Sequence, residues 1–402
     1  MMRIATGGSV QPDALAAASE AWQAMRDALK SESELVICAA NAAYDAEALA
    51  ERLHALAPDG CVVAGASSCS GSMNETGLCL DEEGGVSLIG FADDGKSAFG
   101  AGLRTLGDEP ERDVAEALLE AMSEAGRLGE VPDLIWLSAA PGCEERLLAG
   151  IAQVVGASVP VVGGSSADNA IEGRWWQMHH ARVMHDGVLV IVFYTRAPIA
   201  VSFHSGYAPT ERSGLVTRAE GRKLHEIDGC PAARVYDQWT GGLIGDAQAG
   251  ANILAQSTFH PLGLEAGRIA DVPYYYLLHP ESVLPDGGLS LFADAPEGAR
   301  VVLMEGSADS LVRRAGSVAT GMLERQGWTP ADVAGALVVY CAGCMLGVRD
   351  RLPDVQAALR RALPGVPFQT QFTFGEQGCF IDGVNRHGNL MIAVVLFGRG
   401  CE

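Results

Sequence analysis

Small polar residues follow apolar runs at three places in the chain, and these residues have the most chemistry to offer a ligand. Hydroxyls, carboxylates and glycine backbone N–H groups together suit a small polar metabolite that carries an amine or a hydroxyl. A single Gly-Ser loop after a strand is more often an ordinary turn. Three such loops predict a ligand site if the fold brings them together. They supply Ser67, Ser68, Ser70, Gly71, Gly164, Ser165, Ser166, Asp168, Asn169, Thr373, Gly375 and Glu376.

Cys341 and Cys344 form a C-x-x-C pair directly after an apolar run. Such a pair is a redox couple or half of a zinc site in some proteins, but the chain has no second C-x-x-C. We therefore expect one thiol to lie near the ligand site, and otherwise both to be buried small residues. The alternative function is an enzyme in which Cys341 is the nucleophile and a histidine is the base.

Histidines cluster at residues 179–185, after two tryptophans. If this stretch is extended, His179 and His185 share a face and could hold a transition metal or haem iron. A polar hairpin over the sheet is the interpretation that we favour. His204 is another candidate axial ligand for haem, since one proximal histidine suffices. The absence of C-x-x-C-H excludes covalent c-type haem.

Common catalytic motifs are missing from the sequence. It contains no G-x-x-x-x-G-K-[ST] phosphate loop, no G-x-G-x-x-G between a strand and a helix, and no G-x-S-x-G nucleophile elbow. The acidic pairs at 82–83, 93–94 and 144–145 are predicted to be solvated faces or helix caps. The sequence thus favours binding over catalysis.

Composition excludes several classes of partner. With 28 Lys and Arg against 50 Asp and Glu among 402 residues, the formal net charge is −22, which disfavours nucleic acid and anionic membranes. At 48% hydrophobic residues, the chain has enough apolar side chains for a folded core. Ten scattered cysteines fit a reducing cytoplasm, and no apolar run suits a signal peptide or a membrane span. We expect a cytoplasmic protein that does not enter the membrane.

The elements that must position these residues recur three times. Each stretch contains an apolar run, an amphipathic segment, a second apolar run ending in small residues, and a third apolar run. The pattern predicts β-α-β-β units with a crossover helix and strands buried on both faces. The fold class is therefore α/β, with mixed sheets flanked by helices. The three stretches are residues 35–93, 134–194 and 336–398.

A different region separates the second and third units. It predicts two short strands at 215–221 and 223–229, a helix beginning near Pro231, and a hairpin across 289–306 with a Pro-Glu-Gly turn. A helix at 309–327 then leads into the third unit. We expect two tightly associated domains, 28–215 and 216–402. Residues before about 25 predict either a packed helix or a loose tail.

Four motifs in this order resemble the FIST family. They are Val161 to Asp168 (VVGGSSAD), Val216 to Gly221 followed by Leu224 to Ala232 (LHEIDGCPA), Cys341-Ala342-Gly343, and Phe374-Gly375-Glu376. The resemblance covers about residues 30–398 and implies an N-terminal and a C-terminal FIST part. The family usually has a basic residue after Cys-Ala-Gly, where this chain has Cys344. If that basic residue normally binds an anionic ligand, this chain lacks the contact or binds a softer ligand there.

The resemblance implies a bacterial intracellular sensory protein. Family members bind small ligands and signal to histidine kinases, cyclic-dinucleotide enzymes or other output domains, and some bind haem and report nitric oxide. The chain has no residues left over for such an output domain, so we expect a separate signalling partner. The expected ligand is a small polar, amino-acid-like metabolite, and haem is the alternative.

Overall fold

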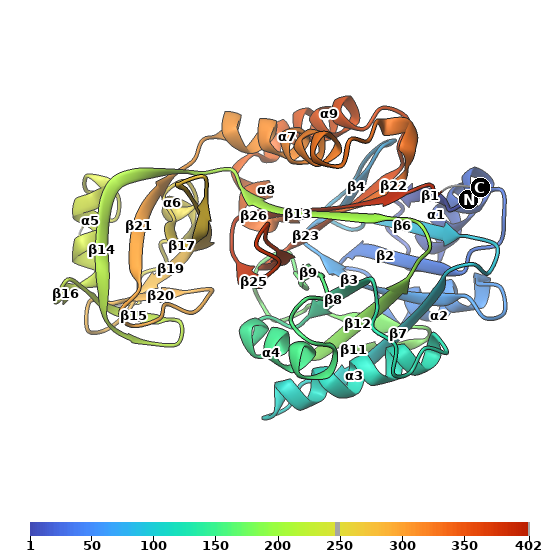
Figure 1. Cartoon of the computed structure of the whole chain (residues 1–402), viewed down its shortest axis with the longest axis horizontal. Helices are drawn as coiled ribbons and strands as arrows, with labels where there is room; N and C mark the ends of the chain where they lie inside the picture. The colour runs from blue at the N-terminus through green and yellow to red at the C-terminus, as the bar shows by residue number, and fades with distance from the viewer. Residues whose placement is uncertain (246–249, 401–402) are drawn as a thin grey trace.

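Three mixed sheets of six strands each make up the core of the computed structural model, and a fourth sheet forms a separate lobe (Figure 1). The structure describes residues 1–245 and 250–400, so Cys401 lies outside it. The two ends of the described chain meet far from the lobe, where Met2 N donates to the carbonyl oxygen of Arg399 at 3.2 Å. Within these residues, no helix has the length and apolarity that a membrane crossing requires.

The predicted repetition is confirmed, and each repeat is longer than predicted. A full repeat runs β-α-β-α-β-β-β-β, so a strand and a helix precede the expected unit. In the first repeat, the residues before about 25 form a strand and most of a packed helix, and not a loose tail. It comprises β1 (Arg3–Ser9), α1 (Ala14–Leu29), β2 (Leu35–Asn41), α2 (Ala46–Leu56), β3 (Val62–Ser68), β4 (Gly71–Asn74), β5 (Gly77–Leu80) and β6 (Val86–Ala92).

The second and third repeats follow the same order. In the third, a lobe is inserted after the first strand and a short extra helix follows the second. The second repeat comprises β7 (Ala98–Thr105), α3 (Pro110–Glu124), β8 (Leu134–Ala139), α4 (Glu144–Val155), β9 (Val161–Ser165), β10 (Gln177–His179), β11 (Arg182–Met184) and β12 (Gly187–Tyr194). The third comprises β13 (Ile199–Ser205), α7 (Ala308–Gln326), β22 (Val333–Cys341), α8 (Ala342–Gly347), α9 (Leu352–Ala362), β23 (Phe368–Thr373), β24 (Glu376–Cys379), β25 (Asn385–Gly388) and β26 (Met391–Gly398).

The central strands of each sheet are parallel neighbours joined by a crossover helix, as the sequence predicts. In the first sheet β2 pairs with β3 in parallel, from Leu35 opposite Val62 to Asn41 opposite Ser68. Every residue of both strands is buried. The sheet order β1-β6-β2-β3 recurs as β7-β12-β8-β9 and β13-β26-β22-β23. The carboxyl ends of parallel strands lie at the same edge of a sheet. The small residues directly after β3, β9 and β23 therefore occupy equivalent positions in the three repeats, and we call these positions the corners.

Each repeat gives its short hairpin to a neighbouring repeat. Hairpin β10–β11 of the second repeat pairs with β3, β24–β25 of the third pairs with β9, and β4–β5 of the first pairs with β23. The sequence predicts a hairpin only for the histidine-rich stretch and polar loops at the other two places. Strands of three or four residues lack an apolar pattern, and their partners are remote in sequence. The exchange ties the three repeats into a closed ring.

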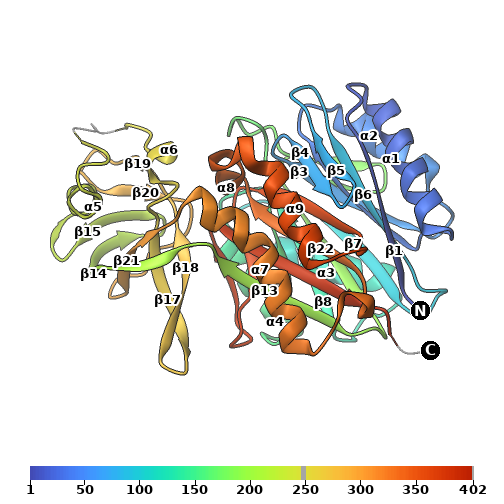
Figure 2. The ribbon, with the colours of Figure 1, turned by 90° about the horizontal axis from the view of Figure 1, so that it is seen from above.

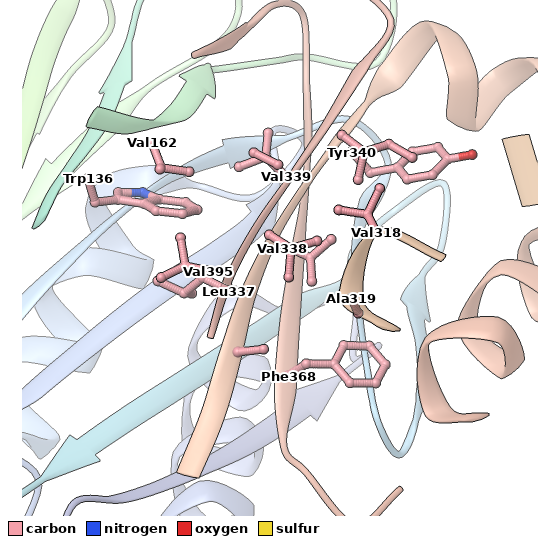
Figure 3. Close-up of a cluster of buried hydrophobic side chains, with 14 of the residues drawn as sticks. Trp136, Val162, Val318, Ala319, Leu337, Val338, Val339, Tyr340, Phe368 and Val395 are labelled. Atoms are coloured by element: carbon pink, nitrogen blue, oxygen red, sulfur yellow. The ribbon is translucent and has the colours of Figure 1, made fainter. Parts of the chain in front are cut away.

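The core continues from sheet to sheet. Figure 3 shows the alternation of β22 across the third sheet, with Leu337 and Val339 facing Trp136 of the second sheet. Val338 faces the opposite way, toward Val318 of α7. All five side chains are at most 4% exposed. Both faces of this sheet are therefore buried, which accounts for the continuous apolar runs that mark the repeats.

The lobe between β13 and α7 confirms the predicted strands and helices but not the predicted hairpin. Strands β20 and β21 do not pair with each other: β20 joins β15 and β19, whereas β21 lies between β14 and β17. The alternation in the sequence identifies two strands but says nothing about their partners. The lobe comprises β14 (Ala208–Glu220), β15 (Lys223–Ile227), β16 (Cys230–Pro231), α5 (Ala232–Thr240), α6 (Leu254–Ser257), β17 (Leu262–Ile269), β18 (Val272–Leu278), β19 (Pro280–Val283), β20 (Leu289–Leu291) and β21 (Arg300–Glu305).

Figure 2 shows the lobe beside the core, with α7 running across the third sheet from the junction. Strand β14 passes without a break through residues 215–216, where the predicted domain boundary lies. That boundary stays a prediction.

Candidate functional site

The three small-residue corners meet at the centre of the ring. Backbone hydrogen bonds at the centre join every pair of repeats: Ser165 N donates to Gly375 O at 2.7 Å, Ala167 N to Ser67 O at 3.3 Å, and Cys69 N to Phe372 O at 3.1 Å. The closed exchange of hairpins brings these segments together, although they lie about 100–300 residues apart in the sequence. The convergence that the repeats predict is therefore present.

The side chains at this centre are buried and bond to one another. Thr373 Oγ1 donates to Glu376 Oε1 at 2.8 Å, Gln177 Nε2 donates to Ser166 Oγ at 2.8 Å, and Trp176 N donates to Ser67 Oγ at 3.0 Å. Ser67, Ser68, Ser165, Ser166, Thr373 and Glu376 have no exposed surface. These hydroxyls already have protein partners, so they stabilise the junction of the repeats.

The remaining corner residues lie around this centre. Asn169 Oδ1 accepts from Ser70 N at 2.7 Å, which joins the first and second corners. Asp168 accepts from four backbone amides between residues 170 and 174. Burial opposes ionisation of Asp168, but these four bonds hold its pKa below the ordinary value. Gly71 has φ +118°, which favours glycine, and a Cβ on Gly164 would lie 2.4 Å from Thr373 Cγ2.

Glu144 lies in the first turn of α4, as the helix-start alternative predicts, but it extends the polar centre to the lobe and is not solvated. Its side chain is 2% exposed and accepts from Ser165 Oγ at 2.5 Å. Arg222 of the lobe donates from Nη2 to Glu144 Oε2 at 2.5 Å and to Glu145 Oε2 at 2.8 Å. Burial opposes ionisation of Glu144, but His387 and Arg222 bring its pKa down to about 2. A helix-start glutamate was expected to face water, and only the insertion of the lobe covers it.

A second predicted acidic pair is also partly buried. Asp93 is 3% exposed and accepts from Ser97 Oγ at 2.7 Å, whereas Asp94 is exposed and pairs with Arg3 at 2.5 Å. The pair at 82–83 is exposed, as predicted. Neighbouring acidic residues therefore do not share one environment in this fold.

Cys341 and Cys344 are buried at the end of β22, beside the polar centre. Burial, and then Cys344, raise the pKa of Cys341 well above its ordinary value. Burial and Cys341 raise the pKa of Glu376 in the same way. A thiol whose pKa is raised is a poor nucleophile at neutral pH, which argues against catalysis by Cys341. Tyr207 lies beside this pair, with its hydroxyl 3.7 Å from Cys344 Sγ.

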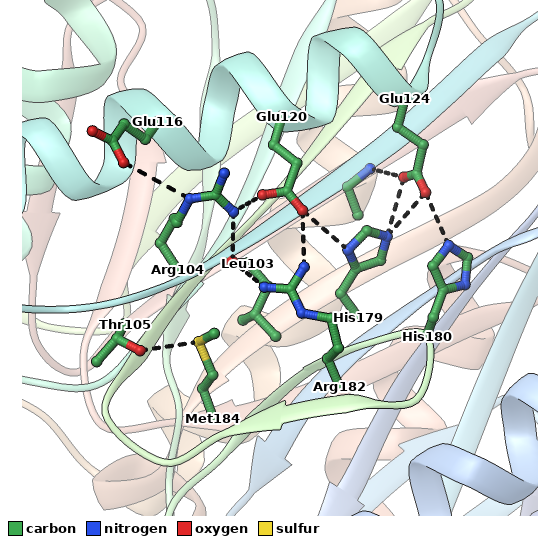
Figure 4. Close-up of polar contacts among 11 residues, drawn as sticks. Leu103, Arg104, Thr105, Glu116, Glu120, Glu124, His179, His180, Arg182 and Met184 are labelled. Atoms are coloured by element: carbon green, nitrogen blue, oxygen red, sulfur yellow. Dashed lines mark hydrogen bonds and ion pairs between the residues drawn. The ribbon is translucent and has the colours of Figure 1, made fainter.

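The histidine-rich stretch forms the hairpin that we favoured. His179 ends β10, His180 occupies the turn, and His185 follows β11, so His179 and His185 lie at opposite ends of the hairpin. Figure 4 shows His179 and His180 both pointing at Glu124, the last residue of α3. His185 is exposed and contacts Glu47 at 3.6 Å. Haem held jointly by His179 and His185 does not fit this arrangement.

His204 lines a cavity of about 640 Å³ between the core and the lobe. Arg313 and Arg314 of α7 contribute two guanidinium groups to its lining, and Ser205, Ser310 and Ser317 contribute hydroxyls. Burial, and then Arg314 and Arg325, lower the pKa of His204 to about 4, so the imidazole is neutral at pH 7. Within the described part of the chain, the buried Nε of Arg314 has no hydrogen-bond partner. This atom is a donor that still lacks an acceptor.

A second cavity of about 470 Å³ lies between α4, β25 and the lobe. Its charged side chains already have partners: Glu145 binds Arg222, Arg386 binds Asp382, and His387 Nε2 contacts Phe292 O at 3.2 Å. The cavity at His204 is therefore the stronger candidate for a ligand site. Of the predicted residues, it contains His204 alone.

The arginines of the cavity gave no signal in the sequence. Arg313 and Arg314 sit in an amphipathic segment, where charged residues normally face water. Arg222 and Glu144 come from regions that the chain brings together only by inserting the lobe. The adjacent Arg313-Arg314 pair in the predicted helix 309–327 is a weak signal, because Arg360-Arg361 forms the same pattern in another predicted helix.

Comparisons with known proteins identify both halves of the chain. The FIST N domain model matches residues 34–230, and the FIST C domain model matches residues 232–379. An uncharacterized protein of Methanocaldococcus jannaschii is 30% identical over 79 residues, which are 20% of this chain and 15% of that protein. The chain therefore covers only a small part of that relative's length.

Solved structures show more distant likenesses. A cyanuric acid hydrolase from A. caulinodans has a TM-score of 0.40 at 10% identity, and the match covers 98% of this chain and 99% of that one. T. maritima PurL in complex with FGAR has a TM-score of 0.24 at 10% identity, covering 99% of this chain and 72% of that one. Similarities this distant carry no conclusion about ligand or reaction.

Proposed function

The chain belongs to the FIST family, a recognised family of sensory domains, and on that premise we propose that it binds a small anionic metabolite in the His204 cavity and signals through a separate partner protein. The observation that carries this proposal is the buried Arg314 Nε without a partner among the residues that the structure describes. A half-buried guanidinium group with an unpaired donor and, among the described residues, no counter-charge within reach is unfavourable, and an anionic ligand would satisfy both its charge and that donor.

The electrostatic setting of the cavity supports an anion. The whole chain has a formal net charge of −22, yet Arg313 and Arg314 outnumber the one carboxylate, Glu305, in the lining of this cavity. Burial is the main cause of the low pKa of His204, and Arg314 and Arg325 lower it further because their positive charges oppose protonation of the imidazole. The first turn of α7 also lines the cavity, and the helix dipole adds to this positive charge.

The lining favours an amino-acid-like ligand. A guanidinium group binds a carboxylate through two parallel hydrogen bonds, and Arg314 is placed to do so. Glu305 lies in the lining and can receive an ammonium group, while Ser205 and Ser310 offer hydroxyls. A compound with both a carboxylate and an amine therefore satisfies the charges on both sides of the cavity.

Signalling would follow from the position of the cavity. Its walls come from the core (His204, Arg314, Phe380) and from the lobe (Tyr274, Met304). A ligand that binds one relative placement of core and lobe more tightly shifts the population toward it and changes the surface offered to a partner. A histidine kinase or a cyclic-dinucleotide enzyme is the partner class that the family suggests.

The ligand is tested by thermal shift of the full chain against L-glutamate, L-aspartate, succinate and inorganic phosphate. We expect a concentration-dependent rise in Tm with at least one carboxylate, lost in Arg314→Met and kept in Arg112→Met. Arg112 is the matched control because it is exposed and remote from the cavity. No shift with any compound, or an equal shift in Arg314→Met, would overturn the proposal.

The conformational step is tested separately with a fluorophore on Cys230. Of the cysteines that the structure describes, Cys230 alone is exposed, and it lies in the lobe. We expect rapid labelling there, and a change of emission when the ligand found above is added. Unchanged emission at saturating ligand would separate binding from signalling and contradict the population shift.

Haem is a second candidate function because His204 presents a neutral imidazole in the same cavity. Tyr274, Tyr275 and Phe380 supply aromatic walls, and Arg313 and Arg314 supply cations that suit haem propionates. Bound haem would provide an iron that gases can ligate. A Soret band after haem addition, lost in His204→Ala but kept in His185→Ala, would favour this function. A spectrum that is the same in both variants would exclude it.

A further inference from the structure

The hairpin β10–β11 brings together two histidines and a carboxylate outside the ligand cavity. His179 Nε2 lies 3.1 Å from both carboxylate oxygens of Glu124, and His180 Nε2 lies 2.9 Å from Glu124 Oε1. All three ligand atoms lie within 4.8 Å of one another. Ligands about 2.0–2.1 Å from a tetrahedral Zn²⁺ ion are about 3.3 Å apart, so this spacing suits one ion.

Backbone strain places the two neighbouring rings on the same side. Adjacent residues of a strand normally point to opposite faces, but His180 has φ +52° at the turn. The ring centroids of His179 and His180 are consequently 4.4 Å apart. Residues other than glycine rarely adopt such a φ, although asparagine and histidine do so more often than most. Strain that aims a side chain at a polar cluster is typical of functional sites.

The charges around Glu124 leave room for a cation. Arg182 and Arg104 both bind Glu120, one turn earlier on α3, rather than Glu124 (Figure 4). In the other group of potential metal ligands (Glu144, Glu145 and His387), Arg222 already binds both carboxylates. The hairpin cluster is therefore the better candidate for a metal ion.

We infer that Glu124, His179 and His180 form a binding site for a divalent transition-metal ion of the zinc class. Imidazole nitrogens and a carboxylate oxygen are ligands that Zn²⁺ and Co²⁺ accept, and three protein ligands leave a fourth position open to water. The Glu124 and His180 side chains are 27% and 30% exposed, so an ion can enter. Haem does not fit, because two rings on the same side cannot bind opposite faces of one macrocycle.

The ring nitrogens are oriented for coordination through Nε2. Both Nε2 atoms face Glu124, and both Nδ1 atoms are buried without a partner among the described residues. An imidazole that coordinates through Nε2 carries its ring proton on Nδ1. The Nδ1–H of His179 then points toward Glu120 Oε1, 3.9 Å away, as second-sphere carboxylates do at metal sites.

The ion would tie the hairpin to α3, and a fourth ligand from the first repeat would join two repeats. Glu124 and the hairpin belong to the second repeat, but the hairpin pairs with β3 of the first. His54 of α2, in the first repeat, has its ring centroid 5.0 Å from that of His180 and is exposed. It is within reach as a fourth ligand after a side-chain rotation.

The test is Co²⁺ and Zn²⁺ titration of chelator-treated full chain, followed by cobalt absorption and calorimetry. We expect one ion per chain and at least about tenfold weaker binding in His180→Asn and Glu124→Gln. Because asparagine tolerates a left-handed φ, His180→Asn should fold as well as the parent before metal is added.

Two control variants complete the experiment. His185→Gln, on the same hairpin, and His387→Gln, in the other group of potential ligands, should bind cobalt as the parent does. No stoichiometric binding would overturn the inference. Binding that survives His180→Asn and Glu124→Gln, or that is lost in His387→Gln alone, would also overturn it.

Discussion

The polar centre of the ring and the His204 cavity both gather hydrogen-bonding groups, but they differ in how those groups are satisfied. At the centre, Thr373, Ser165 and Glu144 each bond to another protein group and are buried. In the cavity, Arg314 Nε has no partner within residues 1–245 and 250–400. Polar residues that bond to one another stabilise the fold, whereas an unpaired cationic donor that lines a cavity is available to a ligand.

The largest effect is expected from breaking the centre. Glu144→Ala removes the acceptor of Ser165 and one of two carboxylates that bind Arg222, so we expect a loss of about 3 kcal/mol in the free energy of unfolding. Urea denaturation measures it. Glu82→Ala, at an exposed position, should change stability by less than about 0.5 kcal/mol. Equal small effects would show that the centre contributes little.

The next largest effect is expected on the pH dependence of stability, where His279 in a closed environment is compared with His204 in the open cavity. Burial lowers the pKa of His279 to about 4, below its ordinary value near 6.5. The unfolded chain thus binds more protons between these values, and stability present above about pH 6.5 is lost as pH falls toward 4.

For His279, which is 3% exposed, that loss is on the order of 3 kcal/mol. His279→Gln should flatten the pH profile of the unfolding free energy over this range. His204→Gln should flatten it less, because the cavity admits water and ions. The opposite order would mean that the cavity at His204 is closed in solution.

The smallest effect on stability is expected at Arg314, which makes it the sharpest contrast with Glu144. Removing a half-buried guanidinium group without an ion-pair partner costs little, so Arg314→Met should change the unfolding free energy by less than about 1 kcal/mol. It should nevertheless abolish the ligand-induced rise in Tm. A loss as large as that in Glu144→Ala would make Arg314 a structural residue.

Much of the core was predictable because its information is local. Apolar runs such as 35–40 and the amphipathic segments between them identify buried strands and crossover helices without knowledge of any remote partner. The equivalence of the corners at Ser67, Ser165 and Thr373 followed from repetition alone. The exchanged hairpins did not, because three- and four-residue strands obtain their stability from sheets remote in sequence.

The candidate sites depended more on tertiary structure. Glu144 has the sequence of an exposed helix start, and the lobe buries it. Arg314 has the sequence of a helix surface, and the same lobe closes a cavity over it. His180 gave no turn signal, because the two-residue turn contains neither glycine nor asparagine.

By itself, the sequence determined the repeated α/β units, the acidic charge and the family. Periodicity, composition and contiguous motifs can be read from the sequence without knowing which segments meet in space. Tertiary structure alone decided which polar groups satisfy each other and which remain open. Burial and hydrogen-bond partners are properties of segments that meet in space, and the exchanged hairpins and the inserted lobe bring those segments from remote parts of the chain.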